Sequence, residues 1–245
     1  YKVNKKKIEI MDTTLRDGEQ TSGMSFSEYE KLTISKLLLK DLMVDRIEVA
    51  SARVSSGEFN AVKKILDWAK TENLENKIEI LTFIDDGISL DWMSKSGAKI
   101  QNLLSKGSLN HLKYQLKKTP QQHFKDVEKI IEIAKKNKIE TNIYLEDWSN
   151  GMKNSKDYVF SFLNFLEKMP IKRVLLPDTL GVLNPNDTYN YLNEIVLKYP
   201  NIHFDFHAHN DYDLSVANTL EGLKAGCHGI HTTINGMGER AGNTP

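Results

Sequence analysis

Short apolar runs, each followed by a longer stretch with helical spacing, recur along nearly the whole chain. The apolar runs cover residues 7–14, 46–51, 77–84, 99–105, 139–146, 173–179, 202–210 and 229–236. The stretches between them place apolar side chains three and four positions apart, and they cover residues 25–42, 57–74, 89–98, 119–138, 155–169, 184–200 and 214–227. Such alternation is typical of α/β proteins in which helices cover a parallel sheet. We therefore expect a closed (β/α)8 barrel, the TIM-barrel fold.

An open, doubly wound sheet is the alternative fold, and a glycine-rich phosphate loop after the first strand would favour it. The first predicted strand instead runs into LRDGEQ, residues 15–20, which is not such a loop. No linker or low-complexity segment interrupts the pattern, so we expect residues 1–245 to form one catalytic domain. The chain stops at Pro245 before an eighth helix. We therefore expect the final helix and any C-terminal linker and regulatory subdomains to belong to a longer native protein.

Composition excludes several classes of partner. Lys plus Arg and Asp plus Glu number 33 each, so no overall field would attract nucleic acid or a membrane surface. The single cysteine, Cys227, cannot form an internal disulfide, which is typical of a reducing cytosol. No apolar run approaches the length of a membrane span, and the lysine-rich start at residues 2–7 is expected to be solvated. We expect a cytoplasmic protein.

Polar residues gather where the predicted strands end. The first strand leads to Arg16 and Asp17, the fifth to Glu146, and the seventh to His207 and His209. In a barrel the C-terminal ends of the strands carry the catalytic groups. Loops are polar in any protein, which accounts for some of this enrichment. The pattern nevertheless exceeds what a purely structural barrel would need.

His207 and His209 are the sharpest local signal, because residues i and i+2 of a strand project to the same face. Two imidazoles on one face at a barrel mouth can bind one metal ion. Asp17 is well placed as a third ligand, since the first, seventh and eighth strands are close neighbours in a closed barrel. This set suits a divalent cation such as Mn²⁺, Mg²⁺, Zn²⁺ or Fe²⁺. The alternative is a pair of hydrogen-bonded strand-end histidines without a metal, and Asp17 shifts the balance toward the metal.

Other polar residues have less specific expectations. Glu48 ends the second strand and could either join the site or anchor Arg16 by a structural salt bridge. His231 is expected to be a hydrogen-bonded barrel residue and not a metal ligand. Three further histidines are expected at the surface or at helix ends, namely His111, His123 and His228. Gly18 is expected to let the backbone turn sharply after Asp17.

Several motifs resemble one known family. LRDGEQ followed after ten residues by Lys31 resembles the N-terminal signature of the 2-isopropylmalate and homocitrate synthases, and HAHNDYDLSVAN resembles their second signature. LPDTLGVLNP and NGMGERAGNTP also resemble strand-end loops of this family. Within it, YLEDWSNG and ASARVSSGE look closest to bacterial citramalate synthase. One departure is Asp213, where the second signature has glycine.

The resemblance implies a Claisen condensation of acetyl-CoA with a small 2-oxoacid, followed by thioester hydrolysis. It implies a metal bound by Asp17, His207 and His209, with Asn243 as an additional ligand. The metal, Mn²⁺, Mg²⁺ or Zn²⁺, would be chelated by the oxoacid and would make its carbonyl carbon more electrophilic. The family also implies a homodimer, because a histidine from the partner's C-terminal region assists.

The remaining roles follow from the same resemblance. Arg16 would neutralise the alkoxide that forms as the carbon–carbon bond closes, and Thr179 would hydrogen-bond the substrate carboxylate. Glu146 matches a carboxylate implicated in deprotonating the acetyl methyl group or in positioning water. Gln20 falls inside the first motif and is expected to contact substrate.

Substrate choice is expected to depend on an apolar wall made of Leu81, Leu104 and Tyr144, which match the family's oxoacid pocket. Two leucines and a tyrosine make a narrow pocket, which favours the methyl group of pyruvate over the isopropyl group of 2-oxoisovalerate. The expected product is therefore citramalate in preference to 2-isopropylmalate.

Two other functional classes remain as alternatives. A metal-dependent lyase of the same barrel superfamily would run carbon–carbon cleavage, but 3-hydroxy-3-methylglutaryl-CoA lyases carry a Gly-Cys-Pro loop after the last strand. This chain reads GMGERAGNTP there, without cysteine. A non-catalytic protein that binds metal or oxoacid would not need Arg16 and Glu146 beside the metal ligands.

Overall fold

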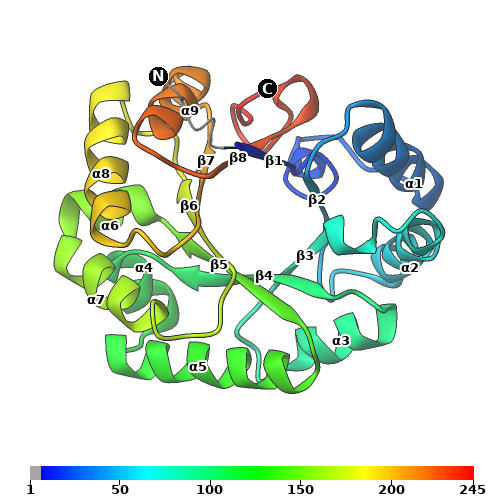
Figure 1. Ribbon diagram of the computed structural model, residues 1–245, viewed down its shortest axis with the longest axis horizontal. Helices are drawn as coiled ribbons and strands as arrows, with labels where there is room; N and C mark the ends of the chain where they lie inside the picture. Colours follow the sequence, from blue (N-terminus) through cyan, green and yellow to red (C-terminus); the bar gives the residue numbers. More distant parts are fainter. Residues whose placement is uncertain (1–6) are drawn as a thin grey trace.

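Eight parallel strands close into a barrel in chain order, with β1 paired to β8 (Figure 1). The structure, a computed structural model, describes residues 7–245, and most of the lysine-rich start lies outside the described residues. The closed barrel confirms the TIM-barrel prediction and excludes the open sheet. The strands are β1 (Glu9–Asp12), β2 (Arg46–Ser51), β3 (Ile78–Thr82), β4 (Ile100–Lys106), β5 (Glu140–Glu146), β6 (Arg173–Asp178), β7 (Phe204–Ala208) and β8 (Gly229–Thr232).

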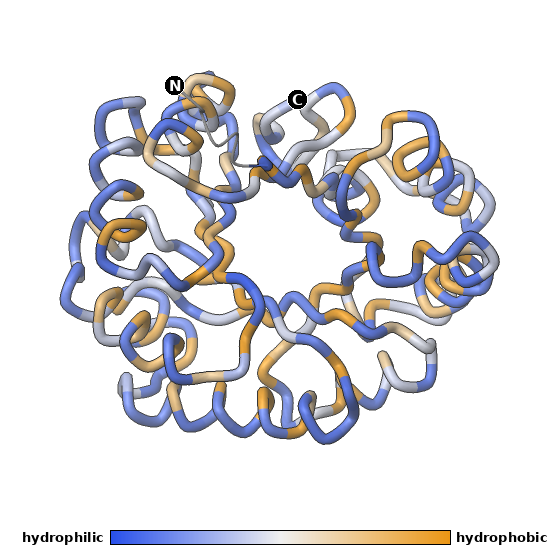
Figure 2. The backbone as a smooth tube through the Cα atoms, viewed as in Figure 1, coloured by the Kyte–Doolittle hydropathy of each residue, from blue (hydrophilic) through white to orange (hydrophobic). Residues whose placement is uncertain are grey.

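Helices surround the barrel, and hydrophobic and hydrophilic residues alternate within them (Figure 2). Every predicted helical stretch contains a helix. Two short helices were not predicted, α4 in the loop after β4 and α6 directly after β5. The helices are α1 (Glu28–Lys36), α2 (Ser56–Thr71), α3 (Ile88–Ser96), α4 (Leu109–His111), α5 (Pro120–Lys136), α6 (Trp148–Asn154), α7 (Lys156–Leu166), α8 (Pro185–Lys198) and α9 (Ser215–Lys224).

Capping residues define where several of the helices begin. Ser27 accepts a hydrogen bond from the Glu30 amide, and the Glu30 carboxylate accepts one from the Ser27 amide, which completes a capping box on α1. Thr119 and Gln122 form the same box on α5, with Pro120 at its first position. These caps fix the loops that follow β1 and β4, and both loops reach the C-terminal mouth of the barrel.

The barrel interior contains one apolar layer and one charged layer. Toward the strand starts, Arg46 donates from Nη1 to Glu79 at 3.0 Å and from Nη2 to Asp205 at 2.5 Å. All three side chains are buried. This charged layer was not predicted, because each residue lies in a different strand and they meet only when the barrel closes. The apolar layer consists of Met11, Leu81, Tyr144 and Leu175, with Phe83 and Leu104 packed against it.

No α-helix follows β8 in residues 233–245. Ile8 and Ile10, on the outer side of the barrel at β1, are 44% and 37% exposed. These large apolar side chains lie where an eighth helix would cover a complete (β/α)8 barrel. The prediction that the chain lacks this helix agrees with the described residues.

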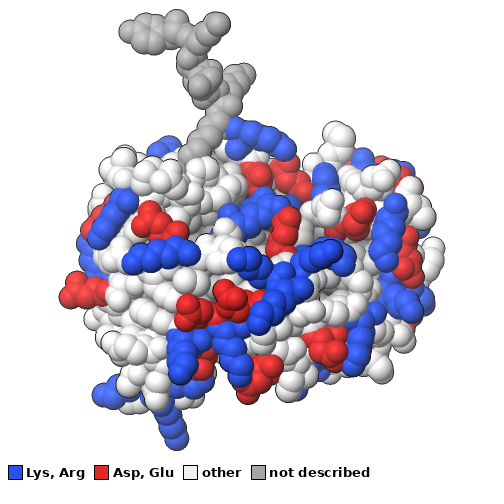
Figure 3. All heavy atoms as spheres, turned by 60° about the horizontal axis from the view of Figure 1, so that its bottom comes forward, with Lys and Arg blue, Asp and Glu red and all other residues white. Residues whose placement is uncertain are grey.

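The visible surface carries acidic and basic side chains interspersed with one another (Figure 3). This distribution matches the balance of 33 basic and 33 acidic residues in the sequence. Among the described residues, no helix combines the length and the apolar character that crossing a membrane requires.

Candidate metal centre and active site

A cavity of about 260 Å³ opens at the C-terminal mouth of the barrel. Every predicted site residue except Asn243 lines it, although these residues come from the ends of six strands. Ser51, Phe83 and Pro177 also line the cavity and were not predicted. Glu239, in the loop after β8, lines it as well. The closed barrel therefore brings the residues of the strand-end pattern together around one cavity.

A tight turn after β1 positions Arg16 and Asp17. The Thr13 carbonyl accepts hydrogen bonds from the amides of Arg16, Asp17 and Gly18 at 3.2, 2.8 and 3.1 Å. A 3₁₀ turn, Gly18–Gln20, then carries the chain away from the mouth. Gly18 is not among the residues with positive φ, so the expectation that the turn needs its special conformational freedom is wrong.

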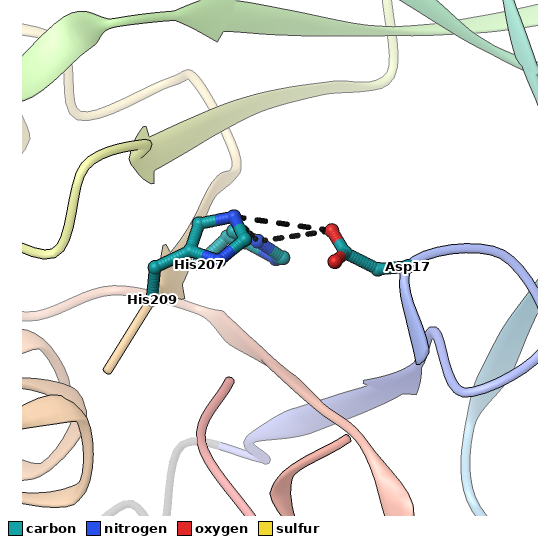
Figure 4. Close-up of side chains that lie close together, drawn as sticks. All are labelled: Asp17, His207 and His209. Carbon is teal, nitrogen blue, oxygen red and sulfur yellow. Dashed lines mark hydrogen bonds and ion pairs between the residues drawn. The ribbon is translucent and has the colours of Figure 1, made fainter. Parts of the chain in front are cut away.

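Asp17, His207 and His209 point toward one another (Figure 4). The two Nε2 atoms are 3.2 Å apart, and Asp17 Oδ2 lies 3.6 Å from His207 Nε2 and 3.9 Å from His209 Nε2. All three side chains are buried, and one potential ligand atom from each lies within 4.8 Å of the others. The spacing is compact enough for a single cation to contact all three.

Burial and mutual contacts place these groups in the protonation states that metal ligation needs. Burial lowers the pKa of His207 well below its usual range, with His209 adding to the effect, and burial also lowers the pKa of His209. Burial acts to raise the pKa of Asp17, but Arg16 and the two histidines outweigh it and lower that pKa strongly. The cluster therefore offers two neutral imidazoles and one carboxylate.

Asn243 contacts two members of this cluster. It forms an isolated antiparallel bridge with His209, and its Nδ2 donates to Asp17 Oδ1 at 3.1 Å. Its Oδ1 is buried and has no hydrogen-bond partner. The side chain thus carries an unpartnered buried oxygen on a residue that contacts Asp17, and an amide oxygen, two imidazoles and a carboxylate form the kind of donor set expected around a divalent cation. The residues present therefore fit a metal.

Arg16 is held beside the cluster by three partners. Nε donates to Glu48 Oε2 at 2.5 Å, Nη1 to Asp17 Oδ2 at 2.8 Å, and Nη2 to the Tyr144 hydroxyl at 3.4 Å. Glu48 also accepts from Thr13 Oγ1 and from Asn102 Nδ2. Of the two roles left open for Glu48, the structure shows the anchor of Arg16, since Glu48 does not line the cavity.

Glu146 and Thr179 occupy the side of the cavity near β5 and β6. The Glu146 carboxylate forms an ion pair with Lys106 Nζ. The Asp147 amide donates to Thr179 Oγ1 at 2.8 Å, and Asp147 itself has a positive φ of 64°. Because this amide occupies an acceptor site on the Thr179 oxygen, the hydroxyl hydrogen remains available to donate into the cavity.

The predicted wall residues Leu81, Leu104 and Tyr144 meet on one side of the cavity, and Phe83 extends the same surface. Burial raises the pKa of Tyr144 well above its usual range, with Glu48 adding to the effect, so its hydroxyl is a neutral phenol. The wall is therefore apolar apart from one hydroxyl group.

Lys31, the distant residue of the first motif, is a buried cation. Its Nζ lies 2.6 Å from Glu19 Oε2 and 2.7 Å from Glu58 Oε1, and it donates to the Leu15 carbonyl at 3.1 Å. These contacts tie α1 and α2 to the segment that carries Arg16 and Asp17. Lys31 thus holds the loop in place by these contacts, and it does not reach the cavity.

The structure also shows the surroundings of two single residues, His123 and Asp213. His123 was expected at the surface or a helix end; it lies in the first turn of α5, but the surface position is wrong. It is fully buried, its Nε2 accepts from the Lys106 amide at 3.3 Å, and burial lowers its pKa to about 4. Asp213, where the family signature has glycine, has a φ of 57°, a conformation that glycine adopts without strain.

The closed barrel, the buried cluster of ligand atoms and the adjacent cation define a TIM-barrel protein with a candidate metal-dependent active site at its C-terminal mouth. Comparison with known proteins gives the particular family. The sequence matches the HMGL-like family over residues 7–245, and the chain belongs to this family.

Curated relatives share about a third of their residues with the chain. A 2-isopropylmalate synthase from Sulfurisphaera tokodaii is 33% identical, over 99% of this chain and 61% of that protein. An (R)-citramalate synthase from Methanocaldococcus jannaschii is 34% identical, over 96% of this chain and 46% of that protein. The chain thus spans about half the length of these relatives. The two percentages of identity do not separate a 2-isopropylmalate synthase from a citramalate synthase.

Solved structures agree with the fold. A Bacillus subtilis HMG-CoA lyase superposes with a TM-score of 0.79 at 20% identity, over 98% of this chain and 83% of that one. The carboxyl transferase domain of Rhizobium etli pyruvate carboxylase superposes with a TM-score of 0.73 at 12% identity, over 98% of this chain and 42% of that chain. At these identities the likeness concerns the barrel alone.

Proposed function

We propose that the chain is the catalytic barrel of an acyltransferase that condenses acetyl-CoA with a small 2-oxoacid, giving a 2-alkylmalate and CoA. The observation that carries this proposal is the joint placement of Asp17, His207 and His209 with the Arg16 cation in one cavity. The similarity to 2-isopropylmalate and citramalate synthases supports it. A homodimer in the cytoplasm remains a prediction.

A divalent cation held by Asp17, His207, His209 and Asn243 would supply Lewis-acid polarisation of the oxoacid's keto group. Mn²⁺, Mg²⁺ and Zn²⁺ all suit this mixture of nitrogen and oxygen ligands. The neutral imidazoles and the ionised aspartate are ready to bind it without first losing protons.

The chain's own residues orient the oxoacid. Thr179 has a hydroxyl hydrogen free to donate to the substrate carboxylate, because the Asp147 amide occupies an acceptor site on its oxygen. Gln20 lines the same cavity and can add a hydrogen bond. The apolar wall faces the oxoacid's alkyl group and excludes water from that side.

Two groups act on the reacting atoms in this proposal. Arg16 stabilises the alkoxide oxygen that becomes negative as the carbon–carbon bond forms, and Glu48 holds the guanidinium in place for it. Glu146, on the opposite side of the cavity, accepts a proton from the acetyl methyl group or positions the hydrolytic water. Lys106, paired with Glu146, fixes the direction of that carboxylate.

The activity is tested by measuring free CoA release in the full-length protein, with each divalent metal and a panel of 2-oxoacids. We expect release to require both a metal and an oxoacid, with pyruvate preferred over 2-oxoisovalerate. If no oxoacid stimulates release above the background hydrolysis of acetyl-CoA, the proposed condensation is wrong. A lyase would instead cleave 3-hydroxy-3-methylglutaryl-CoA, and the absence of cysteine from residues 234–245 argues against it.

Shortening the wall should shift the choice of oxoacid. Leu104→Ala removes three carbon atoms from the wall, so the ratio of kcat/KM for 2-oxoisovalerate to that for pyruvate should rise by about tenfold or more. Steady-state kinetics with both oxoacids measures this ratio. Leu109→Ala, at a partly exposed position outside the cavity, is the matched control and should leave it unchanged. An unchanged ratio in Leu104→Ala would remove that residue from the wall.

A further inference from the structure

His231 lies in the barrel interior directly behind one member of the metal cluster. Its Nδ1 is 3.3 Å from His207 Nδ1 and 3.2 Å from the Tyr144 hydroxyl, and its Nε2 is 3.3 Å from Asp205 Oδ2. The side chains of His231 and Asp205 are both fully buried. His231 does not line the cavity, so any role in the chemistry must act through its neighbours.

The Asp205 end of this arrangement determines which nitrogen of His231 carries a hydrogen. Arg46 Nη2 donates to Asp205 Oδ2 at 2.5 Å, and His203 Nε2 contacts Asp205 Oδ1 at 2.9 Å. A carboxylate next to a buried guanidinium is ionised and only accepts hydrogen bonds. The His231 Nε2 that faces it must therefore be the donor, and Nδ1 is the acceptor of the ring.

This tautomer in turn determines how His207 is oriented. The lone pair of His231 Nδ1 faces His207 Nδ1. His207 therefore donates a hydrogen bond from its Nδ1, and its Nε2 carries no hydrogen. His207 Nε2 is the atom that faces the metal cluster, 3.2 Å from His209 Nε2 and 3.6 Å from Asp17 Oδ2. The ring is thus held with its lone pair toward the metal position, as metal-binding histidines require.

The other imidazole of the cluster has no such support. Nδ1 of His209 is buried and has no hydrogen-bond partner. Of the two histidines, only His207 is therefore oriented by a hydrogen bond from behind. The Tyr144 hydroxyl shares the same acceptor, so His231 also joins the metal cluster to the wall of the cavity.

We propose that His231 is a positioning residue that fixes the tautomer and orientation of His207, with Asp205 and Arg46 behind it as the anchor. The inference rests on the metal-binding role of His207 in the proposed function. It assigns to β8 a residue that raises metal affinity without touching the metal, the substrate or CoA.

Two substitutions separate this role from a merely structural one. Asparagine places its amide near the position of His231 Nδ1, whereas glutamine places its amide near that of Nε2. His231→Asn can therefore still accept from His207 but loses Asp205, and His231→Gln keeps Asp205 but loses the acceptor. If His231 positions His207, His231→Asn should preserve metal affinity. If His231 only donates a hydrogen bond to Asp205, His231→Gln should preserve metal affinity instead.

The experiment measures Kd for Mn²⁺ and Zn²⁺ in the metal-free full-length protein by competition with a chromogenic chelator. We expect His231→Gln to bind about 10–100-fold more weakly and His231→Asn to stay within a few fold of the unmodified protein. His111→Gln, in α4 and away from β7 and β8, is the matched control and should not change Kd.

Each outcome has a defined meaning. Equal affinity of His231→Gln and the unmodified protein, or a loss in His231→Asn as large as that in His231→Gln, would overturn the inference while leaving the proposed function intact. A failure of the unmodified protein to bind either metal would overturn the proposed metal site and the inference with it. If His231→Gln does not fold, the affinity of His231→Asn alone decides, because a loss there contradicts positioning through Nδ1.

Discussion

Replacing His209 with alanine is expected to abolish both metal binding and turnover. His209 Nε2 is 3.2 Å from His207 Nε2 and 3.9 Å from Asp17 Oδ2, so its loss leaves one imidazole, one carboxylate and the Asn243 amide around the proposed cation. Removing a direct ligand should weaken binding by more than the roughly 10–100-fold that losing an outer partner costs. Without the cation, the oxoacid would lose both a binding partner for its oxygen atoms and the Lewis-acid polarisation of its keto group.

The metal-to-protein ratio after equilibrium dialysis checks the first part of this prediction, and CoA release with saturating oxoacid checks the second. Gln121→Ala is a suitable control, since it changes an exposed residue in the first turn of α5 that does not line the cavity. Full metal occupancy in His209→Ala would remove His209 from the ligand set, whatever happened to the activity.

The fold could be predicted because its information is local. Each strand has its own apolar run and each predicted helix its own spacing, and some helices also have a cap, as in the capping boxes at Ser27 and Thr119. The first and last residues of the strands and helices were less well predicted. The first run was expected over residues 7–14, whereas β1 is Glu9–Asp12. The Thr13 amide still donates to the Thr232 carbonyl, but the Thr13 carbonyl accepts from the amides of Arg16 and Asp17 and so closes the turn. The short helices α4 and α6 carry too few residues for a periodic pattern.

The candidate site could be predicted where its residues stand at strand ends, since the closed barrel brings those ends together. Asp17 and His209 are far apart in the sequence and adjacent in the structure. What surrounds them could not be predicted in the same way. The contacts of His231 with Asp205 and His207 depend on the register of β7 and β8, and a sequence pattern does not give distances between side chains on different strands.

Arg16→Lys is expected to retain the metal and lose most of kcat. The guanidinium makes three separate contacts, with Glu48, Asp17 and the Tyr144 hydroxyl, and a lysine ammonium cannot reproduce this planar arrangement. The positive charge therefore remains in the cavity but no longer lies where the alkoxide forms. Loss of one oriented group that stabilises a developing oxyanion costs about 10²–10³-fold in kcat.

Steady-state kinetics on the full-length protein, together with the Kd for the metal, tests this prediction. We expect KM for the oxoacid to change far less than kcat, because the contact strengthens mainly in the transition state. Arg53→Lys provides the control, since Arg53 is an exposed residue paired with Asp85 and does not line the cavity. Near-normal kcat in Arg16→Lys would rule out the alkoxide role. A loss of metal in that variant would instead make Arg16 a residue that assembles the ligand cluster through its contact with Asp17.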